Sequence, residues 1–129
     1  MDALDSYFGV HGQALQLRSK RLELLASNIA NAATPNYKAR DIDFAAELKQ
    51  AETGGGGLAA TENGHIAASA PGAAGDALYR IPNQSSLDGN TVELSVEQTR
   101  FGENAVQYQT TLSFLNGRIN TLMRAMKGE

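Results

Sequence analysis

A regular apolar repeat between residues 101 and 126 constrains this chain more than any other feature of its sequence. Its members are separated by alternating steps of four and three residues, a spacing that places them on one face of an α-helix. This C-terminal seam consists of Phe101, Ala105, Tyr108, Leu112, Leu115, Ile119, Leu122 and Met126. An Asp-Gly-Asn turn signal at residues 88–90 precedes it, so we expect a helix that begins between Thr91 and Ser95 and continues close to the C-terminus. Ser95 and Gln98 have the spacing of a capping box at its start.

A second long helix is predicted near the N-terminus, because residues 3–32 contain no proline. Asp2 or Asp5 can cap its start and place negative charge at the positive end of its dipole. Its apolar stripe is less regular than the C-terminal seam, because His11 and Arg18 interrupt it. This N-terminal seam consists of Leu4, Phe8, Leu15, Leu22, Leu25 and Ile29.

The first helix is expected to end at Pro35, since the proline ring disfavours the α conformation at Thr34 and proline has no N–H for the next helical hydrogen bond. Residues 39–52 form a short amphipathic segment, which we expect to be a helical turn or two packed against the first helix. Around Pro82, the apolar residues of 78–87 predict a short strand or an irregular extended segment.

The middle of the chain has little to bury. The glycine run at 54–57 is followed by residues rich in Gly, Ala and Ser, without strand alternation or a sustained helical stripe. We therefore expect about 53–77 to be flexible. This reading divides the chain into an N-terminal helix at 1–35, a loop and irregular central segment at 36–90, and a C-terminal helix at 91–129.

These elements predict an all-α protein whose long N- and C-terminal helices pair as a coiled coil, with an irregular and partly disordered central segment. A single helix is marginal in water, and a lone pair of helices still leaves much of each helix exposed. A subunit that packs fully only against neighbouring copies would cover both seams. A monomeric helical hairpin with a loose loop accounts for the same periodicity, so the pattern alone leaves both open.

Composition argues against several other classes of protein. The formal charge is -3 at pH 7 and the basic residues are scattered, whereas a nucleic-acid-binding protein carries a cluster of basic residues. The chain has no cysteine, so neither disulfides nor thiolate chemistry can contribute. Its N-terminus is acidic where a cleavable secretory signal would be basic, and no apolar run approaches the roughly 18 residues of a membrane span. We expect neither a cleaved signal nor membrane insertion.

Catalytic and cofactor sites are not expected either. The glycine run at 54–57 is not followed by Lys-Ser or Lys-Thr, so it lacks the form of a phosphate-binding loop. His11 and His65 lie far apart with no ligand-spaced carboxylate, which disfavours a zinc site. Asp41 and Asp43 would need a third catalytic partner, and none is apparent. The sequence therefore predicts a protein that is not an enzyme and that binds no cofactor or metal.

Two asparagines near the end of the first predicted helix call for a specific explanation. Asn28 and Asn31 lie three residues apart on one helix face, although asparagine side chains compete with helical hydrogen bonds. We expect them to bond backbone groups of the turn at Thr34-Pro35 or of a neighbouring helix, with Tyr37 packed back over the helix end. The alternative is a frayed helix end that carries asparagine near its cap.

The sequence around these asparagines resembles the N-terminal signature of the bacterial flagellar rod, hook and hook-associated axial proteins, which has the form A-x-N-[LI]-A-N-x-x-T-P-x-Y. The matching residues are Ala26, Asn28, Ile29, Ala30, Asn31, Thr34, Pro35 and Tyr37. Asn36 stands where that family commonly has glycine. The similarity continues through 38–44, 88–94 and 104–109, and it fails across roughly 53–80, where the family itself is variable.

The resemblance implies a structural subunit of the proximal basal-body rod, the periplasmic shaft that transmits torque from the motor to the hook. Such subunits are exported through the flagellar type III apparatus without a cleaved signal, and they assemble helically through their terminal helices. The implied partners are further copies, the rod protein FlgC, a FliE-type adaptor and the MS-ring protein. From the residues alone, the alternative is a soluble helical adaptor or export chaperone that binds a partner helix in its groove.

Overall fold

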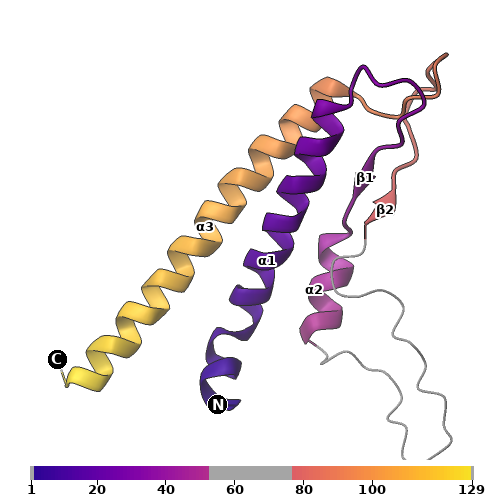
Figure 1. Cartoon of the computed structure of the whole chain (residues 1–129). Coiled ribbons are helices and arrows are strands. Elements are labelled where there is room, and N and C mark those ends of the chain that lie inside the picture. Colours follow the sequence, from indigo (N-terminus) through magenta and orange to yellow (C-terminus); the bar gives the residue numbers. More distant parts are fainter. Residues whose placement is uncertain (1, 53–76, 129) are drawn as a thin grey trace, which may run out of the picture.

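The computed structural model describes residues 2–52 and 77–128 of the chain. The elements follow the order α1 (Asp2–Ala30), β1 (Arg40–Asp41), α2 (Phe44–Glu52), β2 (Leu78–Tyr79) and α3 (Leu94–Lys127). The two long helices lie side by side and run in opposite directions, while α2 and both strands lie on the other side of α1 (Figure 1). The expected class is confirmed as a mostly helical chain with little strand. The predicted flexible segment of about 53–77 falls, apart from Ala77, outside the described residues.

The long helix α3 begins inside the interval that the sequence predicts. Its N-cap is Glu93, whose backbone is extended (φ -108°, ψ 99°). The predicted capping box is wrong, because Ser95 already lies within the helix and the Glu93 side chain makes no cap hydrogen bond. At the other end, Gly128 adopts a left-handed conformation (φ 75°) and donates its N–H to the carbonyl oxygen of Arg124 at 3.0 Å.

The short elements form a small layer on α1. The helix α2 packs against α1, as predicted for the amphipathic segment within 39–52. The strands β1 and β2 are antiparallel, with Arg40 opposite Tyr79 and Asp41 opposite Leu78. The segment expected to be extended around Pro82 therefore begins as a strand and continues without regular structure.

The buried core is small and is not built from the C-terminal seam. Its apolar members are Ala14, Leu17, Leu25, Ala39 and Ile42. The buried side chains of α3 are instead polar, and they are seven residues apart, so they follow one line along the helix. This polar line consists of Glu97, Asn104 and Thr111. Two of its members bond α1: Glu97 accepts from the Asn28 amide, and Asn104 donates to the Arg18 carbonyl oxygen at 2.8 Å.

Candidate assembly site

The asparagine at the centre of the sequence signature is fully buried and joins three elements. The Asn28 side-chain amide donates to the carbonyl oxygen of Arg40 at 2.8 Å and to Oε2 of Glu97 at 3.0 Å. Its Oδ1 accepts the Arg40 N–H at 3.1 Å. The side-chain nitrogen of Asn28 therefore has two acceptors, and its side-chain oxygen has a donor. Asn28 holds β1 against α1 and at the same time fixes the position of α3.

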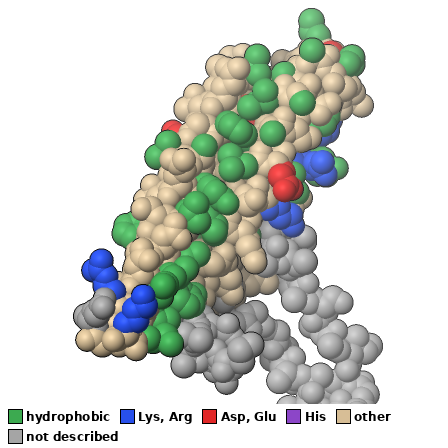
Figure 2. All heavy atoms as spheres, turned by 60° about the vertical axis from the view of Figure 1, so that its left-hand side comes forward, with side chains coloured by type: hydrophobic (Ala, Val, Ile, Leu, Met, Phe, Trp, Pro, Cys, Tyr) green, Lys and Arg blue, Asp and Glu red, His purple; other side chains and the backbone are tan. Residues whose placement is uncertain are grey.

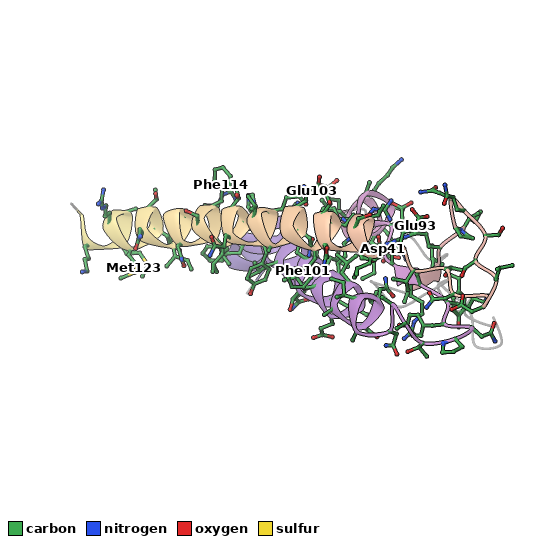
Figure 3. The ribbon with its side chains drawn as sticks, turned by 90° about the horizontal axis from the view of Figure 1, so that it is seen from above. Asp41, Glu93, Phe101, Glu103, Phe114 and Met123 are labelled. Carbon is green, nitrogen blue, oxygen red and sulfur yellow. The ribbon has the colours of Figure 1, made fainter. Side chains whose placement is uncertain are left out.

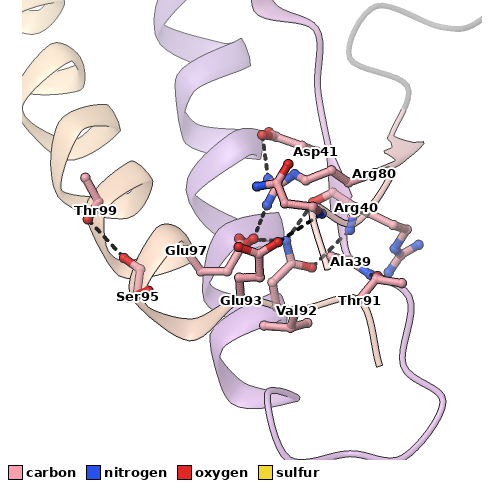
Figure 4. Close-up of polar contacts among 12 residues, drawn as sticks. Ala39, Arg40, Asp41, Arg80, Thr91, Val92, Glu93, Ser95, Glu97 and Thr99 are labelled. Atoms are coloured by element: carbon pink, nitrogen blue, oxygen red, sulfur yellow. Dashed lines mark hydrogen bonds and ion pairs between the residues drawn. The ribbon is translucent and has the colours of Figure 1, made fainter. Parts of the chain in front are cut away.

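A closed ring of charged and amide groups surrounds this contact (Figure 4). Arg21 on α1 donates from Nε and Nη2 to the two carboxylate oxygens of Asp41, at 2.8 and 3.0 Å. Asp41 also accepts from Arg80 at 2.8 Å, and Arg80 donates to Glu97 on α3. Asn28 closes this polar ring by donating to Glu97. The ring links α1, β1, the residue after β2, and α3.

The buried charges of the polar ring are compensated by their partners. Glu97 is fully buried, which would be costly for an unpaired carboxylate. Burial of the Asp41 carboxylate acts to raise its pKa, but hydrogen bonds from Arg21 and the Ile42 N–H, the charge of Arg21 and a hydrogen bond from Arg80 outweigh it. The pKa of Asp41 therefore lies below its ordinary value, and its carboxylate is ionised at neutral pH.

Asn31, the second asparagine of the signature, bonds within its own helix end. The longer-range contacts are made by Asn90, a residue that the sequence analysis did not single out. Asn31 donates to the Ser27 carbonyl oxygen at 2.8 Å and accepts from the Thr34 hydroxyl at 3.1 Å. The side-chain nitrogen of Asn90 contacts the carbonyl oxygens of Asn31, Ala32 and Thr34, at 3.1, 3.0 and 2.8 Å. Asn90 thus caps α1 from a segment far along the chain.

The turn after α1 requires a residue that tolerates a left-handed backbone. Asn36 has a φ of 60°, a conformation that asparagine adopts more readily than other non-glycine residues. This explains why asparagine can occupy a position where similar sequences commonly carry glycine. Gly89 faces it with a φ of 75°, and a Cβ atom there would lie 2.8 Å from Asn36 Oδ1. The Asn36 N–H donates to the Asp88 carbonyl oxygen at 2.8 Å and so joins the turn to the segment 88–90.

The remaining signature residues lie at the end of α1 and in the turn. Tyr37 is half-buried, and its hydroxyl lies 3.0 Å from the Ser27 hydroxyl, so the ring does fold back over the helix end. Ile29 is half-buried. The exposed members of the signature are Ala26, Ala30, Thr34 and Pro35.

The two seams are only partly covered within the chain. In the N-terminal seam Leu25 is buried, whereas Leu15 and Leu22 are half-buried. In the C-terminal seam the half-buried members are Ala105, Tyr108, Leu115 and Leu122. The exposed members are Phe101, Leu112, Ile119 and Met126. Met126 keeps 80% of its surface exposed. Because the polar line faces α1, the apolar seam is turned towards the flank of the helix pair.

Three exposed members of this seam, Phe101, Leu112 and Ile119, belong to a wider face that carries no charge. The residues of this uncharged face follow steps of three and four along α3 and so share one side of the helix. They are Leu94, Gln98, Phe101, Ala105, Gln109, Leu112, Asn116, Ile119 and Met123. Figure 3 shows Phe101 and Met123 on one side of α3, with Glu103 and Phe114 on the other. Figure 2 shows hydrophobic side chains gathered in a stripe along the length of the molecule.

A hollow lies on the side of α3 opposite the uncharged face. Its volume is about 470 Å³, and the described residues that line it are Thr110, Ser113, Phe114, Gly117, Arg118 and Thr121. The Phe114 ring is stacked on His11 of α1, with the ring centres 6.3 Å apart.

Within residues 2–52 and 77–128, no group of three or more His, Asp or Glu side chains is placed to hold a metal ion. No helix of the described chain combines the length and apolar character needed to cross a membrane.

Comparison with known proteins gives a consistent result. Residues 8–38, which include the whole signature, match the model of a family described as flagella basal body rod protein. The chain is 60% identical to the flagellar basal body rod protein FlgB of Cereibacter sphaeroides, over 100% of both chains. It is 47% identical to FlgB of Salmonella typhimurium, over 99% of this chain and 98% of that protein. The identity to FlgB of Escherichia coli is 47%, over 98% of this chain and 97% of that protein.

Proposed function

The chain belongs to the family of FlgB flagellar basal body rod proteins and is a structural subunit of that rod, and on this premise we propose that its copies assemble through α1 and α3. In the proposed assembly a neighbouring copy covers the uncharged face of α3. The two terminal helices would then complete their packing as a coiled-coil layer of the rod, with the N- and C-terminal seams buried together.

One observation carries this proposal. The most regular apolar repeat of the chain is left partly exposed by its own fold, because the polar line of α3 occupies the contact with α1. Leu112 and Ile119 keep 37% and 38% of their surface exposed along an uncharged helix face. A contiguous apolar stripe of this kind is typical of a surface that a partner covers. The motif residues Asn28 to Tyr37 support it indirectly, since they fix the helix pair that presents the face.

Membership of the family supports a more specific proposal for the role. We place the subunit in the proximal, periplasmic part of the rod, where a helical assembly transmits torque, and we infer export by the flagellar type III system without a cleaved signal. Its proposed neighbours are further copies, FlgC, a FliE-type adaptor and the MS-ring protein. The role is structural, without catalysis or a cofactor. An adaptor or chaperone role is not favoured, because the relatives named above are rod proteins.

The direct test replaces an apolar residue of the uncharged face by a charge. Leu112→Asp, or Ile119→Asp, should block incorporation into the rod, because an unpaired carboxylate would be buried in the contact. Motility of a strain that lacks its own copy, and the amount of the chain in isolated basal bodies, measure incorporation. We expect at least a tenfold loss of incorporated protein, on the order of a 1.4 kcal/mol penalty.

The matched control is Thr110→Asp, which adds the same charge to an exposed position of the same helix outside the uncharged face. This variant should assemble normally. Export into the medium, measured in a strain that cannot build the rod, separates a failure of assembly from a failure of secretion. Normal motility and rod content with Leu112→Asp would contradict the proposed function.

A further inference from the structure

An Asn-Gly pair lies inside α3, at Asn116 and Gly117. Asn116 belongs to the uncharged face and is exposed, and Gly117 lines the hollow on the other side of the helix. Water can therefore reach both sides of the bond that joins the two residues. The sequence contains one other Asn-Gly pair, Asn63 and Gly64, which lies outside the described residues.

The fold gives no packing reason for glycine at position 117. A Cβ atom on Gly117 would meet nothing within 4 Å beyond the adjacent turns of α3, so alanine would fit there. Glycine weakens the interior of a helix relative to alanine, because it loses more backbone freedom on folding. The Asn-Gly pair thus places a weak point in α3 directly after an asparagine.

The surrounding part of α3 is weakly held as well. Thr111 is the last buried residue of the helix, and residues 112–127 are exposed or half-buried. Segments with few buried contacts open locally at a low cost in free energy. In the closed helix, the Gly117 nitrogen is held by the helical hydrogen bond to the residue four positions earlier. Each local opening releases this nitrogen.

The released Gly117 nitrogen can attack the side chain before it. A bond forms between this nitrogen and the side-chain carbonyl carbon of Asn116, and the amide nitrogen leaves as ammonia with the proton of the Gly117 N–H. Water then opens the resulting succinimide ring at either carbonyl carbon, breaks the bond of that carbon to the Gly117 nitrogen and returns a proton to it. The product is aspartate or isoaspartate, and each carries a carboxylate. Glycine favours the attack because no side chain crowds its nitrogen.

We propose that Asn116 is a site of spontaneous deamidation that excludes ageing, unassembled copies from the rod. The effect on assembly rests on the proposed function. The new carboxylate lies on the uncharged face, where Leu112 and Ile119 are its helical neighbours, and a neighbouring copy would bury it without a partner. A copy already in the rod is protected, because a covered helix opens less often.

The modification is tested on the purified full chain, incubated at neutral pH and sampled over time. Peptide mapping by mass spectrometry measures aspartate and isoaspartate at each asparagine. We expect product at Asn116 and about tenfold less at Asn120, which is exposed in the same helix and is followed by threonine. In Gly117→Ala the rate at Asn116 should fall about tenfold, since the added Cβ atom crowds the nitrogen and strengthens the helix.

Two outcomes of this experiment would overturn the proposal. Equal rates at Asn116 and Asn120, or an unchanged rate in Gly117→Ala, would show that the Asn-Gly pair has no special reactivity. Product at Asn116 in urea but not in the folded chain would show that the helix protects the site without any neighbour.

The effect on assembly is tested with Asn116→Asp, which carries one of the two products. Thr110→Asp is again the matched control, and rod content is measured in isolated basal bodies as for Leu112→Asp. Asn116→Asp should be incorporated at least about tenfold less than the natural chain. Isoaspartate at position 116 should also be scarcer in isolated rods than in secreted, unassembled chains of the same age.

The failure of this inference is distinguishable from a failure of the proposed function. Normal incorporation of Asn116→Asp, with Leu112→Asp excluded, would overturn the inference and leave the proposed function intact. Normal incorporation of both variants would contradict both. Equal isoaspartate contents in rods and in unassembled chains would overturn the inference alone.

Discussion

At the scale of single residues, the fold depends on polar groups that satisfy one another in the interior. Asn28 and Glu97 are fully buried, and each is bonded to groups from other elements. A buried polar network of this kind is stable only when it is complete, because each missing partner leaves another group unpaired. Single substitutions in the polar ring should therefore cost more than the one bond that they remove.

Replacing Asn28 by alanine should lower the free energy of unfolding by about 3 kcal/mol, because the Arg40 backbone and the Glu97 carboxylate both lose a buried partner. Urea unfolding followed by circular dichroism measures the change. Asn31→Ala is the matched control, since the Asn31 side chain bonds its own helix end and the adjoining turn. The loss of stability in this variant should stay below about 1 kcal/mol. Equal losses for the two variants would show that the buried position of Asn28 is unimportant.

The Asp41 carboxylate makes the stability of the chain sensitive to acid. Its folded pKa lies below its ordinary value, so its contribution to stability is present at neutral pH and is lost as the pH falls through the unfolded carboxyl pKa of about 3.9 towards the lower folded value. Melting temperatures measured from pH 7 to pH 3 should show this decline. In Asp41→Asn, which is less stable at pH 7, the difference from the natural chain should shrink with acid; a constant difference would contradict the assignment.

At the scale of elements, α3 uses two adjacent sides for two purposes. Its polar line faces α1, while its apolar seam lies on the flank and remains partly exposed. The Oδ1 atom of Asn104 is buried there without a hydrogen-bond partner. A buried asparagine in a helix pair fixes register at a cost in stability. The helix pair is thus specified by polar contacts rather than by maximal apolar burial.

Asn104→Leu should raise the free energy of unfolding of the isolated chain by roughly 1 kcal/mol, and its melting temperature with it. The substitution removes an unsatisfied polar atom and fills the same space with an apolar side chain. Asn104→Ala should lower it, since alanine leaves a cavity. Scanning calorimetry distinguishes the two. A lower melting temperature for Asn104→Leu would show that the amide contributes net stability at this position.

Sequence periodicity predicted the existence of both long helices, and local turn signals predicted where α3 begins. The first helix ends at Ala30, earlier than the break that Pro35 predicted. Periodicity could not predict which side of α3 faces α1. That orientation is set by Glu97, whose partners Arg80 and Asn28 come from distant segments. The role of Asn90 could not be predicted for the same reason: the sequence of residues 88–90 indicates only a turn, and the bonds of the Asn90 side chain to the end of α1 have no local signal.

At the scale of the whole molecule, the chain is a helical hairpin with one small layer packed on α1. Few apolar side chains are buried among the residues whose burial the structure describes, and α3 beyond Thr111 is exposed or half-buried. Stability is therefore expected to be uneven, with the highest protection around the polar ring and the lowest towards the end of α3. This distribution suits a subunit whose helices finish packing against neighbouring copies.

Hydrogen exchange of the α3 backbone, compared between the dilute chain and isolated rods, tests the central claim most directly. Amides of residues 112–127 should exchange rapidly in the dilute chain and roughly 100-fold more slowly in the rod, because neighbouring copies then cover the uncharged face. Amides near Glu97 should be protected in both states. Equally strong protection of 112–127 in a dilute monomer would show that the chain completes its own packing, and it would contradict assembly as the source of that order.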